Sequence, residues 1–253
     1  MTVRLLLFAI SLTSAAWPAL GAPAQAAIED AIVRESAPGP APQITTAQLR
    51  DTLSRGGAVL LDARPADEFA MSHIPGALNV AQKPGTPMSL YISDVAEVKR
   101  LVSDRNRMLI VYCNGPYCGK SRRLAEELAA AGYTNVRRYQ LGMHGWRTVG
   151  GVASVAASAI HRVAELDRTA VFIDAGLPSD TRPFSRMASV RVEQVTEAKD
   201  DGRLPMTDHN TRIIVIGSSG SQAREVAAAI AANAFHNVAY FDGDGATLHY
   251  VSR

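Results

Sequence analysis

The two cysteines of this 253-residue chain, Cys113 and Cys118, lie in one short segment that follows the apolar run Met108–Tyr112. The run has the length and composition of a buried strand, and helical spacing resumes soon after the cysteines. A thiol between the carboxyl end of a parallel strand and the start of a helix occupies the edge at which α/β proteins bind ligands. The N–H groups and positive dipole end of that helix stabilise anions and lower the pKa of a thiol. We therefore predict that Cys113 is a reactive thiol and that its substrate is a small anion.

The composition of this segment also favours an anion site. Gly115 and Gly119 allow the backbone to curl so that its amides converge, and Lys120 adds a positive charge. The predicted substrate-binding residues are Asn114, Gly115, Pro116, Tyr117, Cys118, Gly119, Lys120 and Ser121, and the predicted supporting residues are Asp62, Arg64 and Arg122. For Asp62 and Arg64 we expect an ion pair that fixes the neighbouring turn rather than an acid and a base.

Strands and helices that would position these residues alternate along the first half of the chain. The predicted strands are Ala58–Asp62, Met108–Tyr112 and Val136–Tyr139, and the predicted helices are Thr46–Ser54, Val95–Val102 and Ser121–Ala131. This alternation predicts an α/β fold with a parallel sheet covered by helices on both faces.

The second half of the chain repeats the apolar runs of the first half. The matched pairs are 58–63 with 170–175, 107–113 with 212–217, and 135–139 with 237–241. Gly217 stands where the first half has Cys113, and the following loop is predicted to be about two residues shorter. Two homologous units are therefore expected, of which the first has the nucleophile.

The amino terminus has the pattern of a secretory signal peptide over residues 1–26. Arg4 is followed by a short apolar stretch, Leu5–Leu12, and by the small-residue cleavage pattern 24–26. Residues 27–43 form a Pro-rich leader or linker, so we expect a periplasmic or secreted protein without a stable membrane anchor after cleavage. The 26 Lys and Arg residues nearly balance 24 Asp and Glu residues, which gives no indication of nucleic acid as a partner.

Several segments of the first half together resemble a rhodanese (thiosulfate sulfurtransferase) domain over residues 44–150. They are Asp62-Ala63-Arg64, Glu68-Phe69, Ser72–Val80, Val111–Cys113 and Leu141–Trp146. Residues 155–253 are similar to a degenerate rhodanese domain that lacks the nucleophile. The resemblance implies two tandem rhodanese-like domains, each a parallel sheet with helices on both faces.

The resemblance also implies a reaction. The Cys113 thiolate would take the sulfane sulfur of thiosulfate or a similar donor as a persulfide, and a thiol or cyanide would accept it. Neither a cofactor nor a metal ion is expected. The segment 114–120 is longer than typical single-domain rhodanese loops and has Lys120 as its cation, which leaves the donor open. A phosphatase loop of the form C-x5-R is not met, because the sixth residue after Cys113 is Gly119.

The role of Cys118 stays open at this point. It could resolve the persulfide, protect Cys113 as a disulfide, or be a small loop residue without a role. The spacing of the two cysteines permits a disulfide without requiring one. Two further functions remain as alternatives, namely a thiol-disulfide or redox-sensing protein that uses both cysteines, and a non-catalytic binding module.

Overall fold

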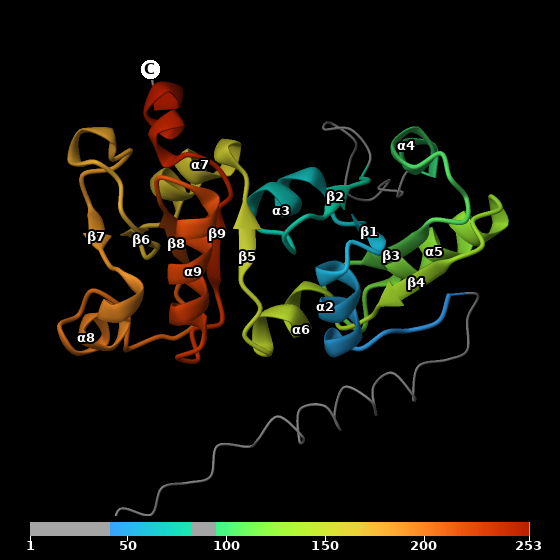
Figure 1. Ribbon diagram of the computed structural model, residues 1–253, viewed down its shortest axis with the longest axis horizontal. Coiled ribbons are helices and arrows are strands. Elements are labelled where there is room, and N and C mark those ends of the chain that lie inside the picture. Colours follow the sequence, from blue (N-terminus) through green and yellow to red (C-terminus); the bar gives the residue numbers. More distant parts are fainter. Residues whose placement is uncertain (1–40, 82–94, 253) are drawn as a thin grey trace, which may run out of the picture.

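The computed structural model describes residues 41–81 and 95–252 and contains two parallel sheets flanked by helices (Figure 1). The predicted α/β fold class is thereby confirmed. The predicted signal peptide and residues 27–40 of the Pro-rich leader lie outside the described residues. Among the described residues, none of the helices is long and apolar enough to cross a membrane.

The first sheet has the strand order β2-β1-β3-β4, and all its strands are parallel. Its strands are β1 (Ala58–Asp62), β2 (Leu78–Asn79), β3 (Met108–Tyr112) and β4 (Val136–Tyr139). Asp62, the last residue of β1, is in register with Tyr112, the last residue of β3. The carboxyl ends of β1 and β3 therefore bring Asp62 and Cys113 to the same edge of the sheet.

Helices cover both faces of this sheet because the strand residues alternate between two apolar clusters. Leu60 and Ile110 pack with Leu49 of one helix, whereas Leu61 and Val111 pack with residues of two other helices on the opposite face. The helices of this half are α2 (Thr46–Ser54), α3 (Ala66–Met71), α4 (Val95–Leu101), α5 (Gly119–Ala130) and α6 (Gly142–Thr148).

The sequence patterns locate most of these elements well. The predicted bounds of β1, β3, β4 and α2 agree with the structure, and α4 ends one residue earlier than predicted. Helix α5 begins at Gly119, two residues before the predicted Ser121, with Cys118 as its N-cap residue, and it ends at Ala130, one residue before the predicted Ala131. The sequence patterns do not predict the short elements α3, β2 and α6.

The second sheet has the order β5-β9-β8-β6-β7. Its strands are β5 (Ala153–Val155), β6 (Val171–Asp174), β7 (Met187–Ser189), β8 (Ile213–Ile216) and β9 (Val238–Phe241). Its helices are α7 (Ala157–Leu166), α8 (Val195–Asp200) and α9 (Gly220–Ala231), with short 3₁₀ turns η2 (Ser179–Thr181), η3 (Val192–Gln194) and η4 (Gly245–Ser252). The series β7-β6-β8-β9 has the same order along the chain as β2-β1-β3-β4, so β8 corresponds to β3.

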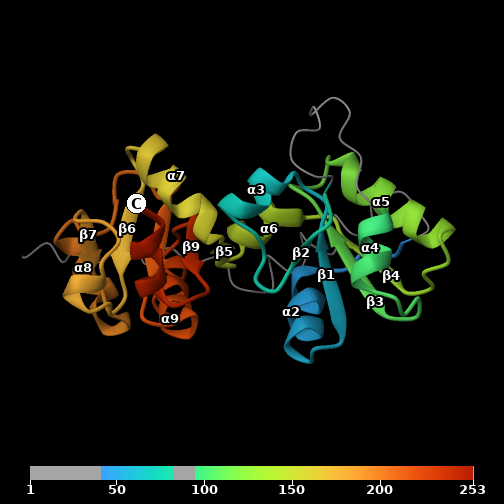
Figure 2. The same cartoon turned by 90° about the horizontal axis from the view of Figure 1, so that it is seen from above.

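Helices α3 and α6 lie between the two sheets in both views, beside β5 at the edge of the second sheet (Figures 1 and 2). His73 and Ser154 exchange backbone hydrogen bonds of 2.9 and 2.8 Å as an antiparallel bridge. One apolar cluster continues from Ile74 and Trp146 to Ile160 and Phe172 of the second half. The second sheet therefore shares a core with the first rather than hanging from a free linker.

Candidate active site

The loop of residues 113–118, called the Cys113 loop below, connects β3 to α5. Cys113 follows β3 directly, is 1% exposed, and forms a disulfide with Cys118 across a Cα–Cα distance of 6.3 Å. The N–H of Cys118 donates to the carbonyl of Gly115 at 3.0 Å, which closes the curl of the loop. The disulfide left open by the sequence is thus present, and the structure represents the oxidised form of the site.

The start of α6 holds the first carbonyls of this loop. Met143 N–H donates to the Cys113 carbonyl and His144 N–H donates to the Asn114 carbonyl, each at 2.9 Å. This approach requires a glycine at position 142, which has a φ of +59°. A Cβ there would collide with the Cys113 carbonyl oxygen. Gly142 therefore allows the start of α6 to pack directly against the backbone of the Cys113 loop.

Positive charge surrounds the loop on the side of α5. The first turn of a helix exposes N–H groups that lack acceptors within the helix, and no side chain caps α5 at Cys118. Partial burial lowers the pKa of Lys120, while Glu68 and Asp62 act in the opposite direction. Such a setting favours an anion beside the loop.

Arg138 of β4 is a further cation at the loop that sequence reasoning did not find. Its Nε donates to Ser121 Oγ at 3.0 Å, and its Nη2 donates to the Cys118 carbonyl at 3.3 Å. Burial lowers the pKa of Arg138, and the charge of Arg122 lowers it further. A basic residue at a buried strand position was the available signal, because such a residue needs a polar partner.

Opposite the loop, α3 contributes Glu68, whose Oε2 accepts a 2.8 Å hydrogen bond from Asn114 Nδ2. This contact orients the first loop residue after Cys113. Tyr117 is fully exposed at the tip of the loop, and Arg122 is exposed on α5. The structure thus places the predicted loop residues together, with Tyr117 and Arg122 directed to the outside.

Asp62 and Arg64 form the expected ion pair, with Arg64 Nη2 2.5 Å from Asp62 Oδ2 and both side chains buried. Arg64 Nη2 also donates to the Ser72 carbonyl at 2.7 Å. Burial lowers the pKa of Arg64, but the hydrogen bond and charge of Asp62 outweigh it and the pKa is raised. The pair ties the end of β1 to the segment that follows α3.

The corresponding loop of the second half, residues 217–219, is called the Gly217 loop. Three residues separate β8 from α9, whereas six separate β3 from α5, so the second loop is three residues shorter and not two. Ser219 caps α9 by accepting from Gln222 N–H at 3.3 Å, and Gln222 Oε1 accepts from Ser218 N–H at 3.0 Å. The polar groups of the Gly217 loop are therefore bonded to α9 and to neighbouring turns, since Ser218 Oγ also donates to the Gly176 carbonyl at 2.7 Å.

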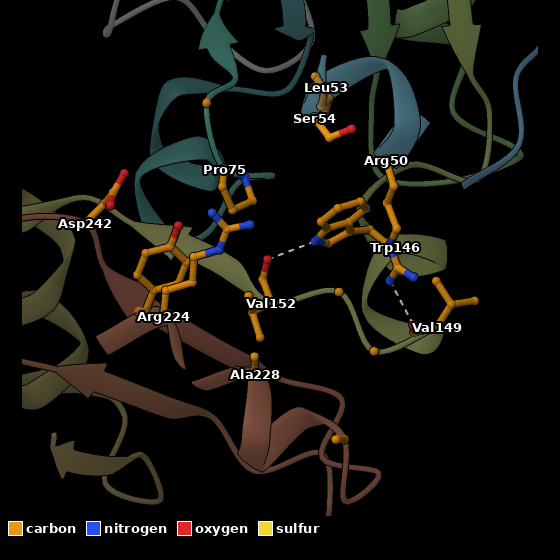
Figure 3. A pocket seen from close by; sticks show the side chains of 15 residues that line it. Arg50, Leu53, Ser54, Pro75, Trp146, Val149, Val152, Arg224, Ala228 and Asp242 are labelled. Atoms are coloured by element: carbon orange, nitrogen blue, oxygen red, sulfur yellow. Dashed lines mark hydrogen bonds between the residues drawn. The ribbon is translucent and has the colours of Figure 1, made fainter. Parts of the chain in front are cut away.

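A cleft of about 850 Å³ lies between the two halves (Figure 3). Trp146 forms part of its wall and donates through Nε1 to the Val152 carbonyl at 2.9 Å. Arg50 lies over the Trp146 ring at 5.2 Å, and Arg224 and Asp242 line the side formed by the second half. Helix α6 connects this cleft to the Cys113 loop, since Gly142 begins the helix and Trp146 follows one turn later.

Among the described side chains, no group of three or more His, Cys, Asp or Glu residues is arranged to hold a metal ion.

Comparison with protein families matches residues 45–148 to the rhodanese-like domain. Residues 45–148 are a rhodanese-like domain. The chain is 29% identical over 116 residues to a human thiosulfate:glutathione sulfurtransferase, which covers 42% of this chain and 93% of that protein. It is also 33% identical over 111 residues to the HTH-type transcriptional regulator Rv0324 of Mycobacterium tuberculosis, of which it spans 44%. That match also covers 44% of this chain.

Solved rhodanese structures are also similar. A thiosulfate sulfurtransferase from Pseudomonas aeruginosa is 22% identical, with a TM-score of 0.37. The match covers 87% of this chain and 46% of the sulfurtransferase chain. The 3-mercaptopyruvate sulfotransferase SseA from Escherichia coli is 19% identical, with a TM-score of 0.36. The match covers 79% of this chain and 97% of the SseA chain. Similarities with TM-scores this low do not indicate a function.

Proposed function

We propose that this protein is a periplasmic sulfurtransferase that moves a sulfane sulfur from thiosulfate or a similar donor to a thiol or cyanide acceptor. The observation that carries the proposal is the position of Cys113, at the carboxyl end of β3 and before the uncapped start of α5, within a rhodanese-like domain. The periplasmic location rests on the signal-peptide pattern of residues 1–26.

Catalysis begins in this proposal with reduction of the Cys113–Cys118 disulfide by a dithiol. The Cys113 thiolate then attacks the sulfane sulfur of the donor, the sulfur–sulfur bond of thiosulfate breaks, and sulfite leaves. The result is a persulfide on Cys113. An acceptor thiolate or cyanide attacks the outer sulfur and regenerates the Cys113 thiolate. Lys120 and the N–H groups at the start of α5 stabilise the anions of both steps.

We assign the chemistry to residues 44–150 and a supporting role to residues 155–253 as a degenerate rhodanese-like domain. This assignment is supported by the equivalent strand order of the two sheets and by Gly217 at the position that corresponds to Cys113. The shared core suggests what the second half contributes, namely burial of the face formed by Ile74 and Trp146.

One observation favours a second candidate function. Cys113 and Cys118 are joined as a disulfide, which is the expected state of a thiol-disulfide or redox-sensing protein. In that case the pair would exchange electrons with partner thiols and carry no sulfane sulfur.

Sulfite release separates the two functions. The full chain is reduced with a dithiol, freed of reductant and mixed with thiosulfate, and sulfite is measured. We expect a burst of about one sulfite per chain from the wild type and none from Cys113→Ser. Absence of a burst from the reduced wild type, with the disulfide still exchanging with added dithiols, would overturn the proposal in favour of the redox function.

A further inference from the structure

The Cys113 loop holds a second thiol in bonding distance of the proposed sulfur carrier. We infer that Cys118 resolves the Cys113 persulfide, so that the transferred sulfur leaves as hydrogen sulfide and the loop ends the turnover as the disulfide present in the structure. This inference rests on the proposed function, because it needs a persulfide on Cys113. It deepens the proposed function by letting the external thiol act on the resulting disulfide, while Cys118 takes the first step.

Contacts on either side fix Cys118 in place. Its N–H donates to the Gly115 carbonyl, and its own carbonyl accepts from Arg138 Nη2. The Cys113 carbonyl is held by Met143 N–H. With both backbones anchored, the two sulfur atoms are held near each other also in the reduced loop. A fixed neighbour of this kind reacts at a high effective concentration.

Burial favours the internal thiol over an external one. Cys113 is 1% exposed, whereas Cys118 is partly exposed beside the fully exposed Tyr117. An acceptor from solution must reach a sulfur attached to a buried residue. Cys118 reaches the same position without any approach from solution.

The bond in the structure is the one that attack of Cys118 on the inner sulfur of the persulfide would form. This bond joins Cys113 Sγ to Cys118 Sγ. Attack on the outer sulfur would instead move the persulfide to Cys118 and form no disulfide. The oxidised loop is therefore the end state expected if sulfide is released.

The step balances in atoms and electrons. Cys118 loses its proton, and its thiolate electron pair forms the bond to Cys113 Sγ. The bond from Cys113 Sγ to the outer sulfur breaks, its electron pair leaves with the outer sulfur as HS⁻, and HS⁻ takes up a proton. The sulfane sulfur is reduced by two electrons while the two cysteine thiols are oxidised to the disulfide.

The positive charge around the loop stabilises both the attacking Cys118 thiolate and the leaving HS⁻. Cys118 is the N-cap residue of α5, where the positive end of the helix dipole stabilises an anion such as a thiolate. Lys120 lies two residues further on, and its charge stabilises HS⁻ as the leaving group.

A dithiol reductant must then reset the loop. Because Cys118 is the more exposed cysteine, the reductant attacks Cys118 Sγ and releases Cys113 as the thiolate. The second thiol of the reductant then frees Cys118 by forming the disulfide of the reductant. Over one cycle, thiosulfate and a dithiol give sulfite, hydrogen sulfide and a cyclic disulfide.

A single-turnover experiment tests the inference. The full chain is reduced, freed of reductant and mixed with one equivalent of thiosulfate, and sulfite, sulfide and protein mass are measured. We expect the wild type to release stoichiometric sulfite and sulfide and to end as the Cys113–Cys118 disulfide. Stoichiometric sulfite with the sulfur retained on Cys113 and no sulfide would overturn the inference and leave the proposed function intact. Absence of sulfite would overturn both.

Two variants test whether sulfide release passes through Cys118. In Cys118→Ser, we expect the persulfide to persist and sulfide to appear only after an external thiol is added. Ser219→Ala is the matched control, because Ser219 is the N-cap residue of α9 as Cys118 is of α5. We expect its sulfide yield to equal that of the wild type, and sulfide release from Cys118→Ser at the wild-type yield would contradict the inference.

Discussion

The Cys113 loop and the Gly217 loop occupy the same place in two sheets of equivalent strand order, yet they are built for different purposes. The Cys113 loop is six residues long, contains both cysteines and leads into a helix without a side-chain cap. The second is three residues long and closed by Ser219 and Gln222. The difference teaches that one sheet scaffold can support two unlike loops, and the proposed chemistry depends on the first of them.

In contrast to the loops, a buried aspartate paired with an arginine at the ends of β1 and β6 is common to both halves. Asp62 pairs with Arg64, and Asp174 pairs with Arg182 at 2.6 Å. Both carboxylates are fully buried; Asp62 accepts the Arg64 N–H, and Asp174 accepts the N–H groups of Gly176 and Leu177. Since this pair is present beside the Gly217 loop, which has no thiol, its role is to hold the turn.

Replacement of the nucleophile should produce the largest difference between the halves. We expect Cys113→Ser to reduce sulfite release from thiosulfate by at least roughly a thousandfold, because a serine hydroxyl is not ionised near neutral pH and the second half offers no substitute. The measurement is the initial rate of sulfite formation by the reduced full chain. Retention of more than a tenth of the wild-type rate would show that Cys113 is not the nucleophile.

Loss of the shared ion pair should affect stability strongly. Asp62→Asn leaves Arg64 buried without its carboxylate and should lower the free energy of unfolding by about 3–5 kcal/mol. Asp174→Asn should cost less, because the Arg182 side chain is 35% exposed and can be hydrated. Urea unfolding measures both.

An exposed pair provides the control for these variants. Asp51 and Arg55 lie on the surface of α2, so Asp51→Asn should change the free energy of unfolding by less than about 1 kcal/mol. A loss in Asp62→Asn no greater than that of Asp51→Asn would contradict the structural role of the pair.

The support beneath the Cys113 loop predicts a smaller effect. Gly142→Ala introduces a Cβ against the Cys113 carbonyl at a φ of +59°, and we expect a loss of about 2–4 kcal/mol in the free energy of unfolding. Gly150→Ala is the matched control. Its φ is +76° but its Cβ would have no neighbour within 4 Å, so only about 1 kcal/mol should be lost. Equal losses in urea unfolding would show that the loop does not rest on Gly142.

A thiol placed in the second loop should have the smallest effect on activity. In the Cys113→Ser background, Gly217→Cys should not restore sulfite release, because Gln222 Oε1 lies 3.0 Å from the new Cβ and already accepts the Ser218 N–H. The sulfite assay checks this result. Restored release would show that the strand-end position alone suffices for the chemistry.

The sequence predicts the scaffold better than the details of the site. Apolar runs locate β1 and β3 because buried parallel strands are continuous in hydrophobicity, and Cys113 follows from the end of β3. The contacts of Gly142 and Arg138 with the loop depend on elements distant in sequence, which no local pattern reveals. The disulfide depends on how tightly the loop curls, and the spacing of its cysteines left that open.

The single-turnover sulfite burst tests the central claim most directly. The chain is reduced with a dithiol, separated from the reductant and mixed with thiosulfate, beside an untreated sample in which the Cys113–Cys118 disulfide is intact. The account predicts about one sulfite per chain from the reduced protein and none from the oxidised protein or from reduced Cys113→Ser. A burst of equal size from reduced Cys113→Ser, or no burst from the reduced wild type, would contradict it.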